Sequence, residues 1–177
     1  EPVTFAELKA ALQVGHDADD AELVAIGIAA RERVEKYTGR QLMSATYTLT
    51  MDAICEDVIR LPRPPVQSVT SISYVDSNGD SQTLATTVYQ LRTDIDPAVI
   101  SLKYQQVWPV TRSQPNAVTI VFVAGYASAA AVPFGLKQAI KMIARSIYDP
   151  EFVNAHQEKS AWKMAIESFL IADDIGE

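Results

Sequence analysis

Residues Arg60–Asp80 read RLPRPPVQSVTSISYVDSNGD and contain two kinds of extended structure in succession. In the first part, three prolines lie within residues 62–65, where they fix φ and remove backbone donors, so a helix is excluded. Val66–Val75 then alternates between two sets of uncharged residues, among which β-branched side chains dominate. This composition predicts a β-strand that is covered on most of both faces.

The strand is predicted to end in a hairpin turn at residues 76–80. Asn78-Gly79 is the strongest short hairpin signal, because a type I′ turn requires positive φ at both central positions. Alternatively, Asp76, Asn78 and Asp80 match the first three oxygen ligands of a calcium-binding loop. Such a loop needs Gly at its sixth position and Glu at its twelfth, where this chain has Ser81 and Thr87. The hairpin is therefore favoured, and residues 82–84 are expected to return as its second strand.

Helical periodicity flanks the extended region on its N-terminal side. Thr4 and Glu7 match a capping box that begins a short helix to about Leu12. An apolar stripe over residues 20–38 predicts a longer helix, which ends at Gly39 because glycine is favoured just past a helix C-terminus.

Helical periodicity returns on the C-terminal side at Val132. Between the two helical parts the period is two, and Ala117–Val123 is the most apolar strand and is expected to lie centrally in a sheet. The sequence therefore predicts an α+β fold. Residues 4–38 and 132–171 form a helical bundle, and residues 42–126 form a β-rich insertion of about six strands within a single domain, 1–177.

The motifs of common catalytic and metal sites are missing from the sequence. It has no glycine-rich phosphate loop, no HExxH and no CxxC. Cys55, His16 and His156 stand alone, without a partner at a ligand or catalytic spacing. The formal net charge of the 177 residues is −7, which argues against a protein that grips phosphate backbones. The sequence therefore predicts no catalytic site, no cofactor site and no metal site. It also predicts no membrane segment and no signal peptide.

The candidate functional residues are those that suit contacts with other subunits or with a partner protein. Three arginines border rigid, proline-rich arms, which bind at a low cost in entropy. A loop tryptophan is either a local core residue or an interface anchor. Three aromatic residues after Pro150 belong either to the core of a closing helix or to a docking surface. A row of cations on one helix face is either solvated or a docking stripe for an acidic partner. The candidates are Arg60, Arg63, Arg112, Trp108, Phe152, Trp162 and Phe169, and the cationic row is Lys137, Lys141 and Arg145.

Several stretches resemble a known family of particle proteins. The most specific are YTGRQL at 37–42, LPRPPVQSV at 61–69 and WPVTRSQPNAVTIVFVAGY at 108–126. They are similar to the head–tail connector proteins, also called adaptor or head-completion proteins, of long-tailed phages, prophages and gene-transfer agents. The resemblance covers residues 2 to about 150 and fades after Pro150.

The resemblance implies a non-enzymatic structural protein without cofactors. In this family a ring, usually of twelve subunits, binds beneath the portal protein, receives the next connector or tail component and continues the DNA channel. The implied location is a virion or phage-like particle that assembles in the bacterial host cytoplasm, with no contact to a membrane. A negative or neutral channel wall would let DNA pass without specific binding.

The sequence is also compatible with two other functions. One is a regulatory protein-binding module. The other is a Mg²⁺-dependent nuclease or hydrolase, whose metal would have to be held by aspartates at a predicted helix start and in a predicted loop. Those aspartates are Asp17, Asp19, Asp20, Asp94 and Asp96.

Overall fold

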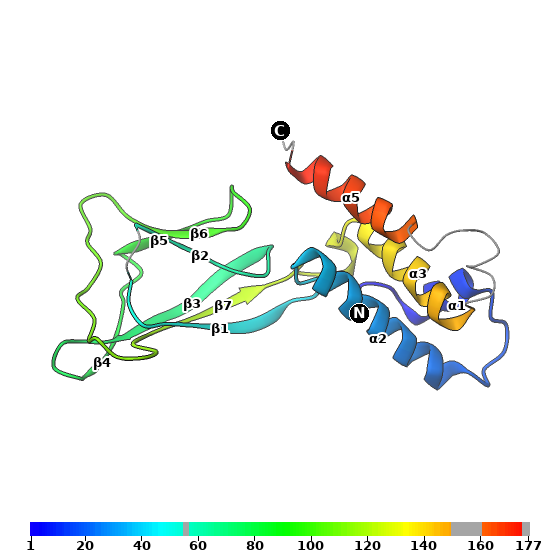
Figure 1. Cartoon of the computed structure of the whole chain (residues 1–177), viewed down its shortest axis with the longest axis horizontal. Coiled ribbons are helices and arrows are strands. Elements are labelled where there is room, and N and C mark those ends of the chain that lie inside the picture. Colours follow the sequence, from blue (N-terminus) through cyan, green and yellow to red (C-terminus); the bar gives the residue numbers. More distant parts are fainter. Residues whose placement is uncertain (55–56, 150–160, 175–177) are drawn as a thin grey trace. The chain divides into compact units, whose positions relative to one another are not determined.

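The computed structural model describes residues 1–54, 57–149 and 161–174, with 168–174 described as backbone only. Within these residues the chain is α+β, as predicted, with four α-helices and two antiparallel sheets (Figure 1). It forms two compact units. Glu1–Thr38 and Ser128–Glu177 make up the first, which we call the helical unit, and Gly39–Ala127 makes up the second, which we call the β unit.

The helical unit is organised around α3 (Phe134–Tyr148), which contacts α1 (Phe5–Leu12), α2 (Asp20–Thr38) and α5 (Ala161–Asp174). A short 3₁₀ helix, η1 (Ala129–Ala131), precedes α3. The first two helices have the predicted bounds. Their apolar stripes are buried together with that of α3, which removes apolar area from water and stabilises the unit. The buried side chains include Leu8, Leu12, Leu23, Ile26, Val34, Leu136, Ile140 and Ile143.

The predicted capping box at the start of α1 is confirmed. The Thr4 hydroxyl accepts a hydrogen bond from the Glu7 amide at 3.2 Å, and the Glu7 carboxylate accepts one from the Thr4 amide at 2.8 Å. The bond from the Thr4 amide, and a second bond that the Thr4 hydroxyl donates to the same carboxylate at 2.9 Å, lower the pKa of Glu7 below its ordinary value of 4.5. The nearby charges of Lys141 and Lys137 lower it further. The carboxylate form of Glu7 is therefore the one that the folded chain favours.

We expect this carboxylate to make stability depend on pH in a defined window. A lowered pKa contributes stability that is present above the unfolded value of 4.5 and is lost as the pH falls through the folded pKa. Glu7→Gln keeps the cap geometry but lacks the charge, so wild type should melt higher than this variant at neutral pH. The difference in melting temperature should shrink as the pH is lowered below 4.5 and through the folded pKa of Glu7. A difference that is unchanged across this range would show that the Glu7 charge is not responsible.

The β unit contains seven strands within its described residues, one more than the predicted number of about six. The large sheet has the order β1 (Ala45–Met51), β7 (Val118–Ala124), β3 (Val66–Val75), β4 (Ser81–Thr83). The small sheet has the order β2 (Val58–Arg60), β6 (Val99–Leu102), β5 (Tyr89–Arg92). As predicted, the most apolar strand, β7, is an inner strand and lies between β1 and β3. The two shortest strands, β2 and β4, have only three residues each.

The core of the β unit lies between the two sheets. In the large sheet, Leu49, Ile120 and Ile72 are paired across β1, β7 and β3 and point to this core. In the small sheet, Ile59 and Ile100 are paired and point to the same core. The two sheets therefore enclose one apolar layer, and the opposite side of the large sheet is its outer face.

The prediction that β3 is covered on most of both faces is wrong for its first half. Gln67, Ser68 and Thr70 are exposed, because nothing in the described chain packs on the outer face there. Two β-bulges in β3 keep its inner residues in register with β7. In that register the outer face carries only uncharged side chains, and we call it the hydroxyl face. It consists of Thr46, Thr48 and Thr50 of β1, Thr119, Val121 and Val123 of β7, and Ser68, Ser71 and Ser73 of β3.

The hairpin is confirmed at the predicted place, but its predicted turn type is wrong. The amide of Gly79 donates to the Asp76 carbonyl at 3.0 Å, and the amide of Asp76 donates to the Asp80 carbonyl at 2.9 Å, which closes a loop of three residues. Gly79 has φ 97°, whereas Asn78 is not among the described residues with positive φ. The Asp76 carboxylate accepts bonds from the amides of Asn78 and Asp80, which favours this wider turn.

The corrected turn gives different expectations for its two central residues. Gly79→Ala should lower the free energy of unfolding by about 1–2 kcal/mol, because a Cβ is strained at that φ. Asn78→Ala should change it by no more than about 0.5 kcal/mol, since its backbone is in an ordinary region. Urea unfolding of both variants, followed by circular dichroism, checks the pair. Equal losses for the two substitutions would contradict the three-residue turn.

Candidate functional site

The candidate contact residues are distributed over both units. Four of them, Arg60, Arg63, Trp108 and Arg112, belong to the β unit. Trp162 lies at the start of α5 in the helical unit. Phe169 lies further along the backbone of α5, and its side chain is outside the described part. Phe152 is also outside the described residues.

The proline arm is built into the β unit. Arg60 is exposed at the end of β2, and Leu61 is buried, with its amide donating to the Ala98 carbonyl at 2.9 Å. The carbonyls of Pro64 and Pro65 accept bonds from the Gln41 and Gly125 amides at 2.9 and 2.8 Å. These bonds fix both ends of the arm, so it presents its side chains at low entropic cost.

Arg63 takes up a constrained position on this arm. Its φ is 60°, and its guanidinium lies 5.1 Å from the centre of the Tyr47 ring, a distance at which a cation is attracted to the face of an aromatic ring. The Tyr47 ring in turn contacts Phe122, whose ring centre is 5.9 Å away. The exposed Arg63 is thereby connected to the core of the β unit.

The aspartates proposed for a metal have other partners. Asp94 is paired with Arg92 at 2.9 Å, which lowers the pKa of that carboxylate, and Asp96 is paired with Arg40. Asp17 and Asp20 accept bonds from the ammonium of Lys9 at 2.8 and 2.7 Å, and Asp19 accepts one from the Tyr148 hydroxyl at 2.9 Å. Within the described ranges, no group of three or more His, Cys, Asp and Glu residues is placed to hold a metal ion. These pairings give the hydrolase alternative no support.

The ion pair between Arg40 and Asp96 was missed by sequence reasoning. Arg40 is buried, with 8% of its surface exposed, and it is 56 positions from its partner. A buried guanidinium requires a paired charge, because desolvating it alone is costly. The available signal was the position of Arg40 in the YTGRQL stretch, which carried the family resemblance.

A long loop between β6 and β7 carries the most exposed apolar side chains of the β unit. Tyr104, Val107 and Val110 are 89%, 79% and 79% exposed. Between them Trp108 is half-buried and packs against the core, and its indole N–H is buried without an acceptor in the described structure. We call residues 104–111 the apolar loop.

Arg112 fixes the end of the apolar loop to the hairpin. Its amide donates to the Val75 carbonyl at 2.9 Å. Its guanidinium lies so close to Gly79 that a Cβ at that position would be 2.4 Å from Nη1. Trp108 and Arg112 therefore hold the loop at two points, while the neighbouring apolar side chains face solvent.

Trp162 lies in the core of the helical unit. Only 6% of its surface is exposed, and its ring meets that of Tyr37 edge-on at 5.2 Å. The guanidinium of Arg33 lies 5.1 Å from the ring centre. This position agrees with the core alternative for Trp162.

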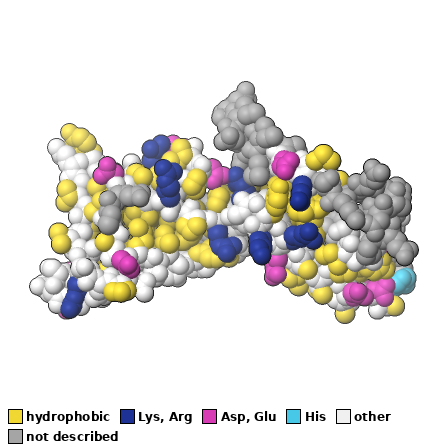
Figure 2. All heavy atoms as spheres, in the orientation of Figure 1, with side chains coloured by type: hydrophobic (Ala, Val, Ile, Leu, Met, Phe, Trp, Pro, Cys, Tyr) yellow, Lys and Arg dark blue, Asp and Glu magenta, His cyan; other side chains and the backbone are white. Residues whose placement is uncertain are grey.

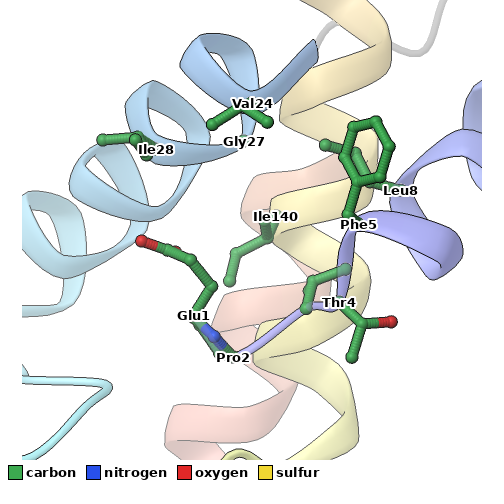
Figure 3. A pocket seen from close by; sticks show the side chains of 10 residues that line it. Glu1, Pro2, Thr4, Phe5, Leu8, Val24, Gly27, Ile28 and Ile140 are labelled. Carbon is green, nitrogen blue, oxygen red and sulfur yellow. The ribbon is translucent and has the colours of Figure 1, made fainter. Parts of the chain in front are cut away.

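The helical unit also contains an apolar hollow with a volume of about 330 Å³ (Figure 3). Phe5 and Leu8 of α1 line it together with Val24 and Ile28 of α2. At its rim, the Glu1 carboxylate is paired with Arg31 at 3.0 Å. The lining offers apolar contact and no cluster of reactive groups. Separately, no helix in the described part of the chain is long and apolar enough to cross a membrane.

The candidate residues therefore lie at exposed arms and loops or within the core, and comparison with known proteins bears on their role. No family model matches the chain, and no curated protein matches it. Three similar solved structures are parts of gene transfer agent particles. The first is the neck of an empty particle computed with C6 symmetry (TM-score 0.71, 28% identity, covering 84% of this chain and 78% of that one).

The other two matches are of the same kind. One is a chain of the virion of a native gene transfer agent particle, with a TM-score of 0.70 and 29% identity over 84% of this chain and 78% of that one. The other is the neck of a native particle computed with C12 symmetry, with a TM-score of 0.62 and 29% identity over 83% of this chain and 79% of that one. The comparisons confirm the predicted resemblance to connector-type proteins and support a structural protein of a phage-like particle.

Proposed function

We propose that this chain forms a ring in the neck of a phage-like particle, beneath the portal, where it joins head to tail. The observation that carries the proposal is the match over 84% of the chain to a particle neck, at a TM-score of 0.71 and 28% identity. Matches to necks computed with C6 and C12 symmetry agree with a ring oligomer. We assign twelve subunits to the ring, as the family resemblance implies.

Each part of the chain has a role in this proposal. The helices from both ends of the chain form one bundle, and the β unit is an insertion in it, so that residues 1–177 act as a single connector domain. The segment after Pro150 contacts the portal, and the opposite side of the ring receives the next connector or tail component. Assembly takes place in the bacterial host cytoplasm.

The ring acts without chemistry on a substrate. With a formal charge of −7 for each copy, the channel that it encloses repels the phosphates of DNA, so that DNA passes without specific binding. Neither the regulatory module nor the Mg²⁺-dependent hydrolase is supported by the comparisons, and we propose a non-enzymatic role.

The test is electron microscopy of the purified chain with and without a purified portal ring. We expect twelve-fold rings, alone or stacked on one side of the portal, and a complex that survives gel filtration. A chain that neither forms rings nor binds the portal at any concentration would overturn the proposal. Nuclease activity that depends on Mg²⁺ and is lost in Asp94→Asn would overturn the non-enzymatic role.

A further inference from the structure

We propose that the apolar loop of one copy packs on the hydroxyl face of the next copy in the ring. The inference rests on the proposed ring and adds to it the two surfaces that meet. A ring needs a heterologous contact, in which one patch of a subunit meets a different patch of its neighbour. The β unit carries two exposed patches of matching character, and both can be described within that unit alone.

The hydroxyl face has the composition of a covered surface. The alternating, β-branched and uncharged residues of β3 are typical of a strand with both faces buried. In the described part of one copy the inner face is buried, whereas the hydroxyl face is not: Thr46, Thr48, Thr50 and Ser68 are exposed and its other five positions are half-buried. Nine neighbouring positions of this face lack any charge, although 21% of all residues are charged. An occupant outside this copy therefore accounts for the pattern of the sequence.

The apolar loop has the composition of an inserting surface. Residues 104–111 read YQQVWPVT and contain no charge. Tyr104, Val107 and Val110 expose most of their surface, whereas Trp108 anchors the segment in the core of its own copy. A long loop that is rigidly attached and presents apolar side chains is a common form of binding loop.

The two patches complement each other in charge and in hydrogen bonding. Burying a charge without a partner is costly, and neither patch contains a charge that the contact would bury. The amides of Gln105 and Gln106 and the hydroxyl of Tyr104 are donors and acceptors of the kind that the hydroxyls of the sheet require. Lys103 and Arg112 flank the apolar loop, and the Lys103 ammonium donates to the Thr86 carbonyl at 2.9 Å. The residues between them, like the hydroxyl face, offer no charge to an acidic or basic partner such as DNA.

The positions of the two patches suit a head-to-tail contact. The apolar loop runs along one end of the β unit, from the small sheet to the large one, as Figure 1 shows. In Figure 2, hydrophobic side chains are visible along this end of the unit. The hydroxyl face belongs to the side of the large sheet that is turned away from the small sheet. Because the patches lie on different sides of the unit, one copy can use both at once.

Cysteine cross-linking tests the contact in the full-length chain. Thr48→Cys and Val107→Cys are made separately in a Cys55→Ser background, which removes the one native cysteine. An equimolar mixture, concentrated and oxidised with and without the portal, should give a disulfide-linked dimer. Each variant alone should stay monomeric on a denaturing gel, because a heterologous contact does not bring identical residues together. Mixing Thr93→Cys, an exposed position between β5 and β6 and outside both patches, with either variant should give no dimer.

A charge exchange provides a second test that does not depend on disulfide geometry. Thr48→Glu and Val107→Glu should each reduce ring formation in electron micrographs while circular dichroism stays unchanged. Thr48→Lys combined with Val107→Glu should restore the rings.

Rings that form normally, with no cross-link and no effect of these charges, would overturn this contact while the proposed function stands. A chain that forms neither rings nor cross-links and does not bind the portal would overturn both. Intact rings of Thr48→Lys that retain DNA in low salt would assign the hydroxyl face to the channel instead.

Discussion

Gly125→Ala is expected to destabilise the β unit by about 4 kcal/mol. Gly125 has φ 104°, and a Cβ there would lie 2.3 Å from the Met43 carbonyl oxygen. The strain of that φ costs ~1–3 kcal/mol, and forcing an added methyl into the packed site costs ~1–3 kcal/mol. Relaxation is restricted, because the Gly125 amide is bonded to Pro65 and its carbonyl to the side chain of Gln67.

Two other glycines provide matched controls for this substitution. Gly39 has φ 68° and nothing within 4 Å of an added Cβ, so Gly39→Ala should cost about 1 kcal/mol from φ alone. Gly15 has neither a positive φ nor a close neighbour, and Gly15→Ala should be within about 0.5 kcal/mol of wild type. A loss for Gly125→Ala no greater than that for Gly39→Ala would contradict the close approach to Met43.

The two tryptophans allow this loss to be assigned to one unit. Trp108 belongs to the β unit and Trp162 to the helical unit. In a Trp162→Phe background, urea unfolding followed by fluorescence reports on the surroundings of Trp108. We expect Gly125→Ala to shift that transition strongly. In a Trp108→Phe background, the fluorescence of Trp162 should show a smaller shift, unless the two units unfold together.

Much of the fold was predictable because it depends on local signals. Thr4 and Glu7 define the start of α1 through bonds between neighbouring residues, and the stripe of α2 is a periodic pattern that needs no knowledge of its partner. The apolar content of β7 predicted its inner position. The turn type was not predictable from Asn78-Gly79 alone, because the side chain of Asp76 competes for the same backbone amides.

The surfaces were harder to predict because they depend on pairs of residues that are distant in sequence. Arg40 and Asp96 are 56 positions apart in the sequence, and they meet only in the folded β unit. The pattern of β3 predicted that both faces are covered, yet no element within the described residues of one copy covers the first half of its outer face. The sequence singled out Trp108 in the loop between β6 and β7 but not its neighbour Val107. The importance of Val107 follows from its 79% exposure beside the anchored tryptophan.

Trp162→Ala is expected to lower the free energy of unfolding of the helical unit by about 3–5 kcal/mol, the usual cost of removing a buried tryptophan. The side chain is 6% exposed and contacts Tyr37 and Arg33, so its loss leaves a cavity and removes an aromatic and a cation–π contact. Trp162→Phe keeps most of the volume and should cost no more than about 1.5 kcal/mol. Urea unfolding by far-ultraviolet circular dichroism measures both variants.

The same residue decides how a portal contact near the C-terminus has to be tested. Deleting residues 151–177 would remove Trp162 and Ile166, which are 6% and 0% exposed, so the loss of folding and the loss of binding could not be separated. Deleting only residues 168–177 spares both side chains. We expect this shorter deletion to stay folded and to weaken portal binding. If it binds the portal fully, the contact lies elsewhere. If Trp162→Ala stays as stable as wild type but no longer binds, Trp162 is a docking residue and not a core residue.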